Sequence, residues 1–185
     1  IETAFTKELT TTNSNSYTIL HLATHGQLST GDPKDSFILF GDGEKATITD
    51  IRKWALTNVD LVVLSACQSG LGSKLGNGVE ILGLGYQIQA AGARMSIATL
   101  WKVSDVGTEK LMDAFYTAVK TGKVSNVEAL RQAQVAMITD NYEDLGETRG
   151  IVSIEARPRS TSSTAPTKIS HPYYWAAFIL IGNGL

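Results

Sequence analysis

The chain has 185 residues, of which 43% are apolar and 18% are charged, and its formal net charge is −2. This length and apolar content predict one folded domain with a sizeable core and argue against global disorder. The small net charge gives no reason to expect nucleic acid or an anionic membrane as a partner, and no apolar run reaches the ~20 residues that span a bilayer.

The first 16 residues are rich in Thr, Ser and Asn, and they predict a linker or lead-in before a domain over 17–185. This polar start has no signal-peptide pattern and no initiator Met, so we expect a piece of a longer chain. The single cysteine cannot form an internal disulfide. We therefore expect a reducing, cytoplasmic compartment.

The first elements predicted are a strand, a hairpin and a short helix. YTILHLAT (17–24) has the composition of a buried strand. DSFILFGDGEKATIT (35–49) predicts a hairpin with a Gly-Asp-Gly turn. TDIRKWAL (49–56) predicts a short helix, with Thr49 or Asp50 as its cap.

The next strand is VDLVVLSA (59–66), in which four consecutive core-type residues occur without alternation. Such a run is typical of a parallel strand covered by helices on both faces of the sheet. A glycine-rich loop over 70–78 then leads into a helix over 78–91. Gly83 and Gly85 lie inside that helix, where each glycine lowers helix stability by about 1 kcal/mol relative to Ala. Close packing of the helix against the sheet would explain why glycine is present there.

The second half begins with a third buried strand, RMSIATLW (94–101). Two helices follow, over 105–121 with Ser104 as cap and over 126–138 with a capping box that starts at Ser125.

The last part of the chain breaks this pattern. Residues 140–172 contain turn signals and the stretch ARPRSTSSTAP, and they predict a surface insertion. The closing YYWAAFILIG predicts a final core strand. Strands that alternate with helices predict an α/β fold with a mostly parallel central sheet.

Two chemically reactive residues follow predicted strands. The first strand leads into HLATHG, with His25, and the second into LSACQSG, with the only cysteine, Cys67. Ligands of open α/β sheets bind at the carboxyl ends of the strands, so neighbouring strands would bring imidazole and thiol together. An imidazole favours the thiolate of a thiol whose free pKa is about 8.5. The backbone N–H groups of Gly26 and Cys67 are candidates for an oxyanion hole.

Four stretches of the chain, taken in order, resemble the CHAT domain family from about Tyr17 to Gly182. They are HLATHG, LVVLSACQSGLG, AAGARMSIATLWKVSD and HPYYWAAFILIG. These are caspase-like cysteine peptidases of the HetF type, usually attached to tetratricopeptide repeats. The resemblance implies a caspase-haemoglobinase-like three-layer fold, with His25 as general base and Cys67 as nucleophile. It implies protein substrates, no metal or other cofactor, and a regulatory partner that binds through a repeat region outside this chain.

The resemblance also implies a specificity site in TLWKVSD (99–105). Asp105 at the pocket base would select Arg or Lys before the cut, and Trp101 would form a wall. The alternative for Asp105 is purely structural, because a carboxylate at a helix start favours the macrodipole.

Other interpretations stay open at this point. His21 either supports His25 or is a hydrogen-bonded core histidine, and His171 is expected to form a structural turn before the last strand. A zinc site from His21, His25 and Cys67 is disfavoured, since HLATH lacks the glutamate of the helical zinc-protease motif. Instead of a peptidase, the chain could be a caspase-like interaction module with little turnover, or a cysteine-elbow enzyme of the amidotransferase type.

Overall fold

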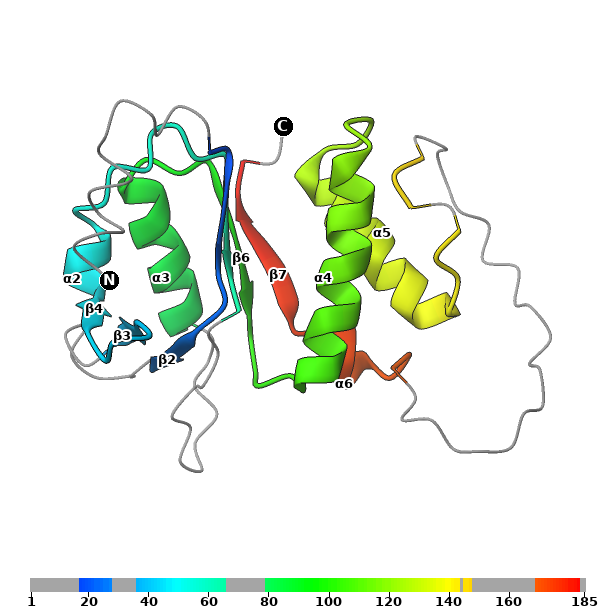
Figure 1. Cartoon of the computed structure of the whole chain (residues 1–185), viewed down its shortest axis with the longest axis horizontal. Coiled ribbons are helices and arrows are strands. Elements are labelled where there is room, and N and C mark those ends of the chain that lie inside the picture. The colour runs from blue at the N-terminus through cyan, green and yellow to red at the C-terminus, as the bar shows by residue number, and fades with distance from the viewer. Residues whose placement is uncertain (1–16, 28–35, 66–78, 144, 148–168, 184–185) are drawn as a thin grey trace. The chain divides into compact units, whose positions relative to one another are not determined.

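The computed structural model describes residues 17–27, 36–65, 79–143, 145–147 and 169–183 (Figure 1). The chain forms two compact units. The first, called the sheet unit below, comprises the residues up to Lys102 together with the strand that starts at Phe178. The second, called the helical unit, comprises Val103–Ala177.

The sheet unit is built on a four-stranded sheet in the order β1-β5-β6-β7. The pairs β1–β5 and β5–β6 are parallel, and β7 pairs with β6 in the antiparallel direction. The predicted α/β class with a mostly parallel central sheet is therefore confirmed. The strands are β1 (Ile19–Leu22), β5 (Leu61–Leu64), β6 (Met95–Thr99) and β7 (Phe178–Gly182).

The two central strands, β5 and β6, are buried along their whole length, as predicted, and in β5 the reason is its unbroken run of core-type residues. Helix α3 (Val79–Ala90) lies along one face of the sheet and contacts β6 and β7 (Figure 1). A Cβ atom at Gly85 would lie 2.6 Å from Cδ1 of Ile181 on β7. This contact confirms that Gly85 allows the close approach of helix and sheet.

A second, three-stranded sheet consists of β2 (His25–Gln27), β3 (Phe37–Leu39) and β4 (Lys45–Thr47) in antiparallel pairs. β3 and β4 form the predicted hairpin. Its turn includes Gly43 at a φ of +87°, a conformation that glycine adopts at low cost.

The short helix after this hairpin differs from the prediction. Helix α2 covers Ile48–Ile51, and its N-cap is Thr47 rather than Thr49 or Asp50. Asp50 instead accepts a hydrogen bond from the Thr47 backbone N–H, and Thr47 Oγ1 accepts one from the Asp50 N–H. This reciprocal capping box starts the helix at the residue where β4 ends, two residues earlier than Thr49.

The helical unit contains α4 (Asp105–Lys120), α5 (Asn126–Thr139) and the short α6 (Pro172–Trp175). Ser104 and Ser125 cap the two long helices, as predicted, by accepting hydrogen bonds from Gly107 N and Glu128 N. In the second cap, the Glu128 carboxylate binds the side chains of Arg131 and Gln132.

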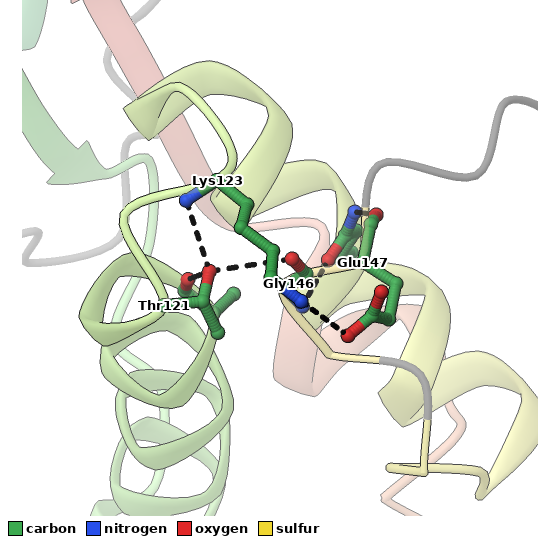
Figure 2. Close-up of polar contacts among 6 residues, drawn as sticks. Thr121, Lys123, Gly146 and Glu147 are labelled. Carbon is green, nitrogen blue, oxygen red and sulfur yellow. Dashed lines mark hydrogen bonds and ion pairs between the residues drawn. The ribbon is translucent and has the colours of Figure 1, made fainter.

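Residues 145–147 lie against these helices, although 140–172 is predicted as a surface insertion (Figure 2). Gly146 is buried, its N–H donates to Oε1 of Gln132 at 2.7 Å, and its carbonyl accepts from the Thr121 hydroxyl at 3.2 Å. Lys123 forms an ion pair with Glu147 at 3.0 Å. Residues 145–147 are therefore packed, and residues 148–168 lie outside the described part of the chain.

The closing aromatic stretch is helical where a strand is predicted. Tyr173 and Trp175 belong to α6, and the final strand starts only at Phe178. The reason is the cap: Nδ1 of His171 accepts from Tyr173 N, and Pro172 occupies the first helical position. His171 has a structural role, as predicted, but it caps a helix, and α6 with two further residues separates it from β7. Within the described residues, no helix has the length and apolar content needed to cross a membrane.

Candidate functional site

The candidate site begins at the edge of the sheet where β1 and β5 end, called the exit edge below. The two strands are parallel neighbours, which is the condition under which the sequence analysis brings His25 and Cys67 together, and their register pairs Leu22 with Leu64. One further hydrogen bond, from Ser65 N to Leu22 O at 3.0 Å, extends the ladder beyond β5. Both strands therefore leave the sheet at the same edge.

His25 follows the exit of β1 by three residues. The strand predicted over 17–24 ends at Leu22, and the chain bends at Thr24 before His25 enters β2. There His25 pairs with Leu39 of β3, and the Thr24 hydroxyl donates a hydrogen bond to the Leu39 carbonyl. The three-stranded sheet thus fixes the backbone of Thr24 and His25, from which the imidazole extends.

The His25 side chain is exposed. No hydrogen bond joins its ring to another residue of the described ranges. An accessible imidazole on a fixed backbone can take or give a proton without first breaking a bond to its surroundings.

His21 lies on β1, opposite Val63 of β5. A hydrogen bond of 2.7 Å joins its Nε2 to Oγ of Ser65. Although the residue as a whole is exposed, its surroundings remove enough water from the ring to lower the pKa of His21. The predicted hydrogen bond is confirmed, whereas the predicted core position is wrong, because His21 lies on the face of an edge strand opposite the core residue Leu22.

Cys67 lies outside the described residues, as do the glycine-rich loop 70–78 and Gln68. The described chain reaches Ser65, two residues before the cysteine. Gly26, the other candidate for the oxyanion hole, is half-buried in β2, opposite Ile38.

The two candidate specificity residues belong to different units. Trp101 is half-buried just after β6 in the sheet unit. Asp105 is exposed as the first residue of α4 in the helical unit. Its carboxylate lies in the first turn, where negative charge favours the helix dipole, so the structural interpretation of Asp105 has direct support.

Two residues at the exit edge are absent from the sequence-based set, namely Ser65 and Thr24. Each hydroxyl connects a strand exit to another strand, at separations of 44 and 15 residues along the chain. Serine and threonine at the ends of strands carry no local signal that distinguishes such contacts. Within the described ranges, no group of three or more His, Cys, Asp or Glu residues is arranged to hold a metal ion.

The chain is an α/β protein with a mostly parallel sheet. An accessible histidine follows one strand and the single cysteine follows its parallel neighbour in sequence, which defines a candidate site at one edge of the sheet. The profile of the CHAT domain matches residues 2–183, nearly the whole chain, and the protein belongs to the CHAT domain family. This family is related to the caspase-like cysteine peptidases. A comparison with curated proteins found no match.

Proposed function

We propose that this protein is a cysteine endopeptidase in which Cys67 is the nucleophile and His25 the general base. The observation that carries the proposal is the register of β1 and β5. Leu22 pairs with Leu64, and His25 and Cys67 each follow their paired leucine by three residues. Both residues therefore follow the same end of two neighbouring parallel strands, which is where the ligand sites of open α/β sheets lie, and this supports proximity of the two side chains.

The chemistry follows from these two groups. A free thiol with a pKa of about 8.5 is mostly protonated at neutral pH, and an adjacent imidazole removes the proton or favours the thiolate. The Cys67 sulfur attacks the scissile carbonyl, and the N–H groups of Gly26 and Cys67 stabilise the oxyanion. His25 returns the proton to the leaving amine, and water then releases the acyl group from the sulfur.

The proposal extends to specificity and context. Asp105 binds the Arg or Lys side chain before the scissile bond, with Trp101 as a wall, in a caspase-haemoglobinase-like arrangement of three layers over 17–185. This chemistry requires no metal and no other cofactor. The expected setting is the cytoplasm, with regulation through a repeat region outside this chain.

Active-site labelling tests the central claim. A peptide acyloxymethyl ketone with Arg at the cleavage position should alkylate the wild-type protein. Because the chain has one cysteine, a mass increase reports Cys67 directly. The variants Cys67→Ala and His25→Ala should both prevent labelling, while unfolded His25→Ala still reacts with iodoacetamide. Wild-type protein that is folded but unlabelled would contradict the peptidase and favour the interaction module.

A second experiment tests the specificity role of Asp105. Asp105→Asn keeps the shape of the side chain and removes its charge. A hydrogen bond to a charged group contributes about 1.5–3 kcal/mol, so the preference for Arg over a neutral residue should fall roughly 10- to 100-fold. Asp113→Asn, at an exposed aspartate of the same helix α4, is the matched control. An unchanged preference in Asp105→Asn would remove Asp105 from the site.

A further inference from the structure

The exit of β5 is tied to β1 by two hydrogen bonds at one residue. Ser65 donates its backbone N–H to Leu22 O at 3.0 Å, and its Oγ lies 2.7 Å from His21 Nε2. The first bond continues the parallel ladder, whereas the second joins side chains and depends on the identity of both residues. Ser65 is therefore held both along the strand and on one face of it.

The placement of this pair follows from the strand register. His21 lies opposite Val63, and Ser65 is two residues further along β5, so all three share a face of the sheet. Leu22 and Leu64 belong to the apolar core cluster. The polar bond therefore lies on the face away from that cluster, and Ser65 is one residue beyond the last paired position of β5.

The histidine suits this role because burial favours its neutral form. Partial burial lowers the pKa of His21, so the ring is protonated less readily than a fully solvated imidazole. A neutral imidazole has one donor and one acceptor nitrogen, and either tautomer can bind a serine hydroxyl.

A similar side-chain hydrogen bond occurs after the end of β1. The Thr24 hydroxyl binds the Leu39 carbonyl, one residue before His25. Ser65 is tied two residues before Cys67. Each proposed reactive residue thus follows closely on a residue that a side-chain hydroxyl fixes to a different strand.

We propose that His21 and Ser65 are positioning residues for the reaction, and that their hydrogen bond sets the position of Cys67 relative to His25. This inference rests on the proposed function, because it concerns the same two reactive groups. Neither residue touches the substrate; both act through the backbone that leads to the sulfur. A displacement of about 1 Å at a reacting group can lower a rate about 100-fold, so one bond at this place has a large effect.

The test uses the single cysteine as its own probe. The rate of alkylation by iodoacetamide, measured against pH, gives the thiol pKa of Cys67 whether or not the protein cleaves a peptide. In the wild-type protein we expect this pKa to lie below about 8.5 and to rise towards that value in His25→Ala. Ser65→Ala and His21→Leu should raise it in the same direction, and should lower kcat about 10- to 100-fold with little change in KM.

Conservative variants separate positioning from general loss of structure. Ser65→Thr keeps the hydroxyl, and His21→Gln keeps a polar group near the position of Nε2, so both should retain most of the kcat and the low thiol pKa. The double variant His21→Leu/Ser65→Ala should lose no more than either single variant, because the two residues act through one bond. Ser125→Ala is the matched control, since it removes a serine hydrogen bond from the cap of α5 in the helical unit.

The outcomes distinguish the two proposals. If His25→Ala changes the thiol pKa while Ser65→Ala changes neither the pKa nor kcat, the positioning role is overturned and the peptidase stands. If His25→Ala leaves both the thiol pKa and kcat unchanged, the proposed function fails, and the positioning role fails with it. Fully additive losses of kcat in the double variant would contradict the claim that His21 and Ser65 act through one shared hydrogen bond.

Discussion

The exit edge of the sheet unit and the starts of α4 and α5 in the helical unit are both held by hydroxyl groups, but the contacts differ in range. At the exit edge, His21 and Ser65 are 44 residues apart in the chain. In the helical unit, Ser104 and Ser125 each cap a helix through a residue three positions away. Local signals therefore predict where helices begin, whereas the geometry of the candidate site depends on pairing between distant segments.

The largest expected effect compares two exposed histidines. If His25 is the general base, His25→Ala should lower kcat/KM roughly 10²- to 10⁴-fold. His171→Ala, which removes the N-cap of α6, should leave kcat/KM unchanged and lower stability by about 1 kcal/mol. Steady-state cleavage of an Arg-containing peptide measures the first effect, and urea unfolding measures the second. Equal losses of activity in both variants would show that the comparison reports stability rather than chemistry.

The next effect compares two glycines with positive φ. Gly182 has a φ of +124°, and a Cβ there would lie 2.5 Å from the Arg94 carbonyl oxygen, a backbone atom that cannot move away easily. Gly182→Ala should therefore destabilise the sheet unit by about 2–4 kcal/mol, from backbone strain and overpacking together. Gly43 has a φ of +87° with open space around it, so Gly43→Ala should cost only the strain, about 1–2 kcal/mol. Similar midpoints of urea unfolding for the two variants would contradict this reasoning.

A smaller effect concerns the helix cap at Ser125. Ser125→Ala leaves the Glu128 N–H without its hydroxyl partner and should lower stability by about 1 kcal/mol. Ser125→Asp should restore the cap. Thr117→Ala, at an exposed position inside α4, should be neutral or slightly stabilising because alanine has the higher helix propensity. Thermal unfolding ranks the stabilities of the three variants. A loss of stability in Thr117→Ala as large as in Ser125→Ala would contradict the role of Ser125 as a helix cap.

The smallest expected effect is the dependence of stability on pH, and the pH range in which stability is lost differs between the two units. Hydrogen bonding to Arg131 lowers the pKa of Glu128, so this group stabilises the fold above its unfolded pKa of about 4.3 and loses that contribution as the pH falls through the folded value. Burial lowers the pKa of His21, and its contribution is complete above about 6.5 and is lost as the pH falls below that value.

Matched variants check these two ranges. Glu128→Gln should reduce the loss of stability below about pH 4.3, and His21→Gln should reduce the loss that begins below about pH 6.5. Urea unfolding at a series of pH values measures both. A titration of His21 by NMR that gives a pKa above 6.5 would contradict the burial argument.

Several elements could be predicted from their residues because the signal is local. The continuous apolar run of β5 indicates a buried parallel strand, and the serine caps indicate the starts of α4 and α5. The stretch Tyr173–Trp175 favours a strand by its aromatic residues, but the cap at His171 and the proline after it make it helical. Helix α2 starts earlier than its residues predict because Asp50 acts at the third helical position and not as the cap.

By itself, the sequence determined the α/β class, the order of the four strands of the main sheet and of the three long helices, the family, and the placement of His25 and Cys67 after two strands. Periodicity, caps and motifs are properties of neighbouring residues, and they can be recognised before the chain folds. Only the tertiary structure decided that β1 and β5 pair with Leu22 opposite Leu64, that His21 reaches Ser65, and that Gly146 packs against the helical pair. These contacts join residues far apart in the chain, and their free energy is gained only when the whole sheet or helical unit has formed.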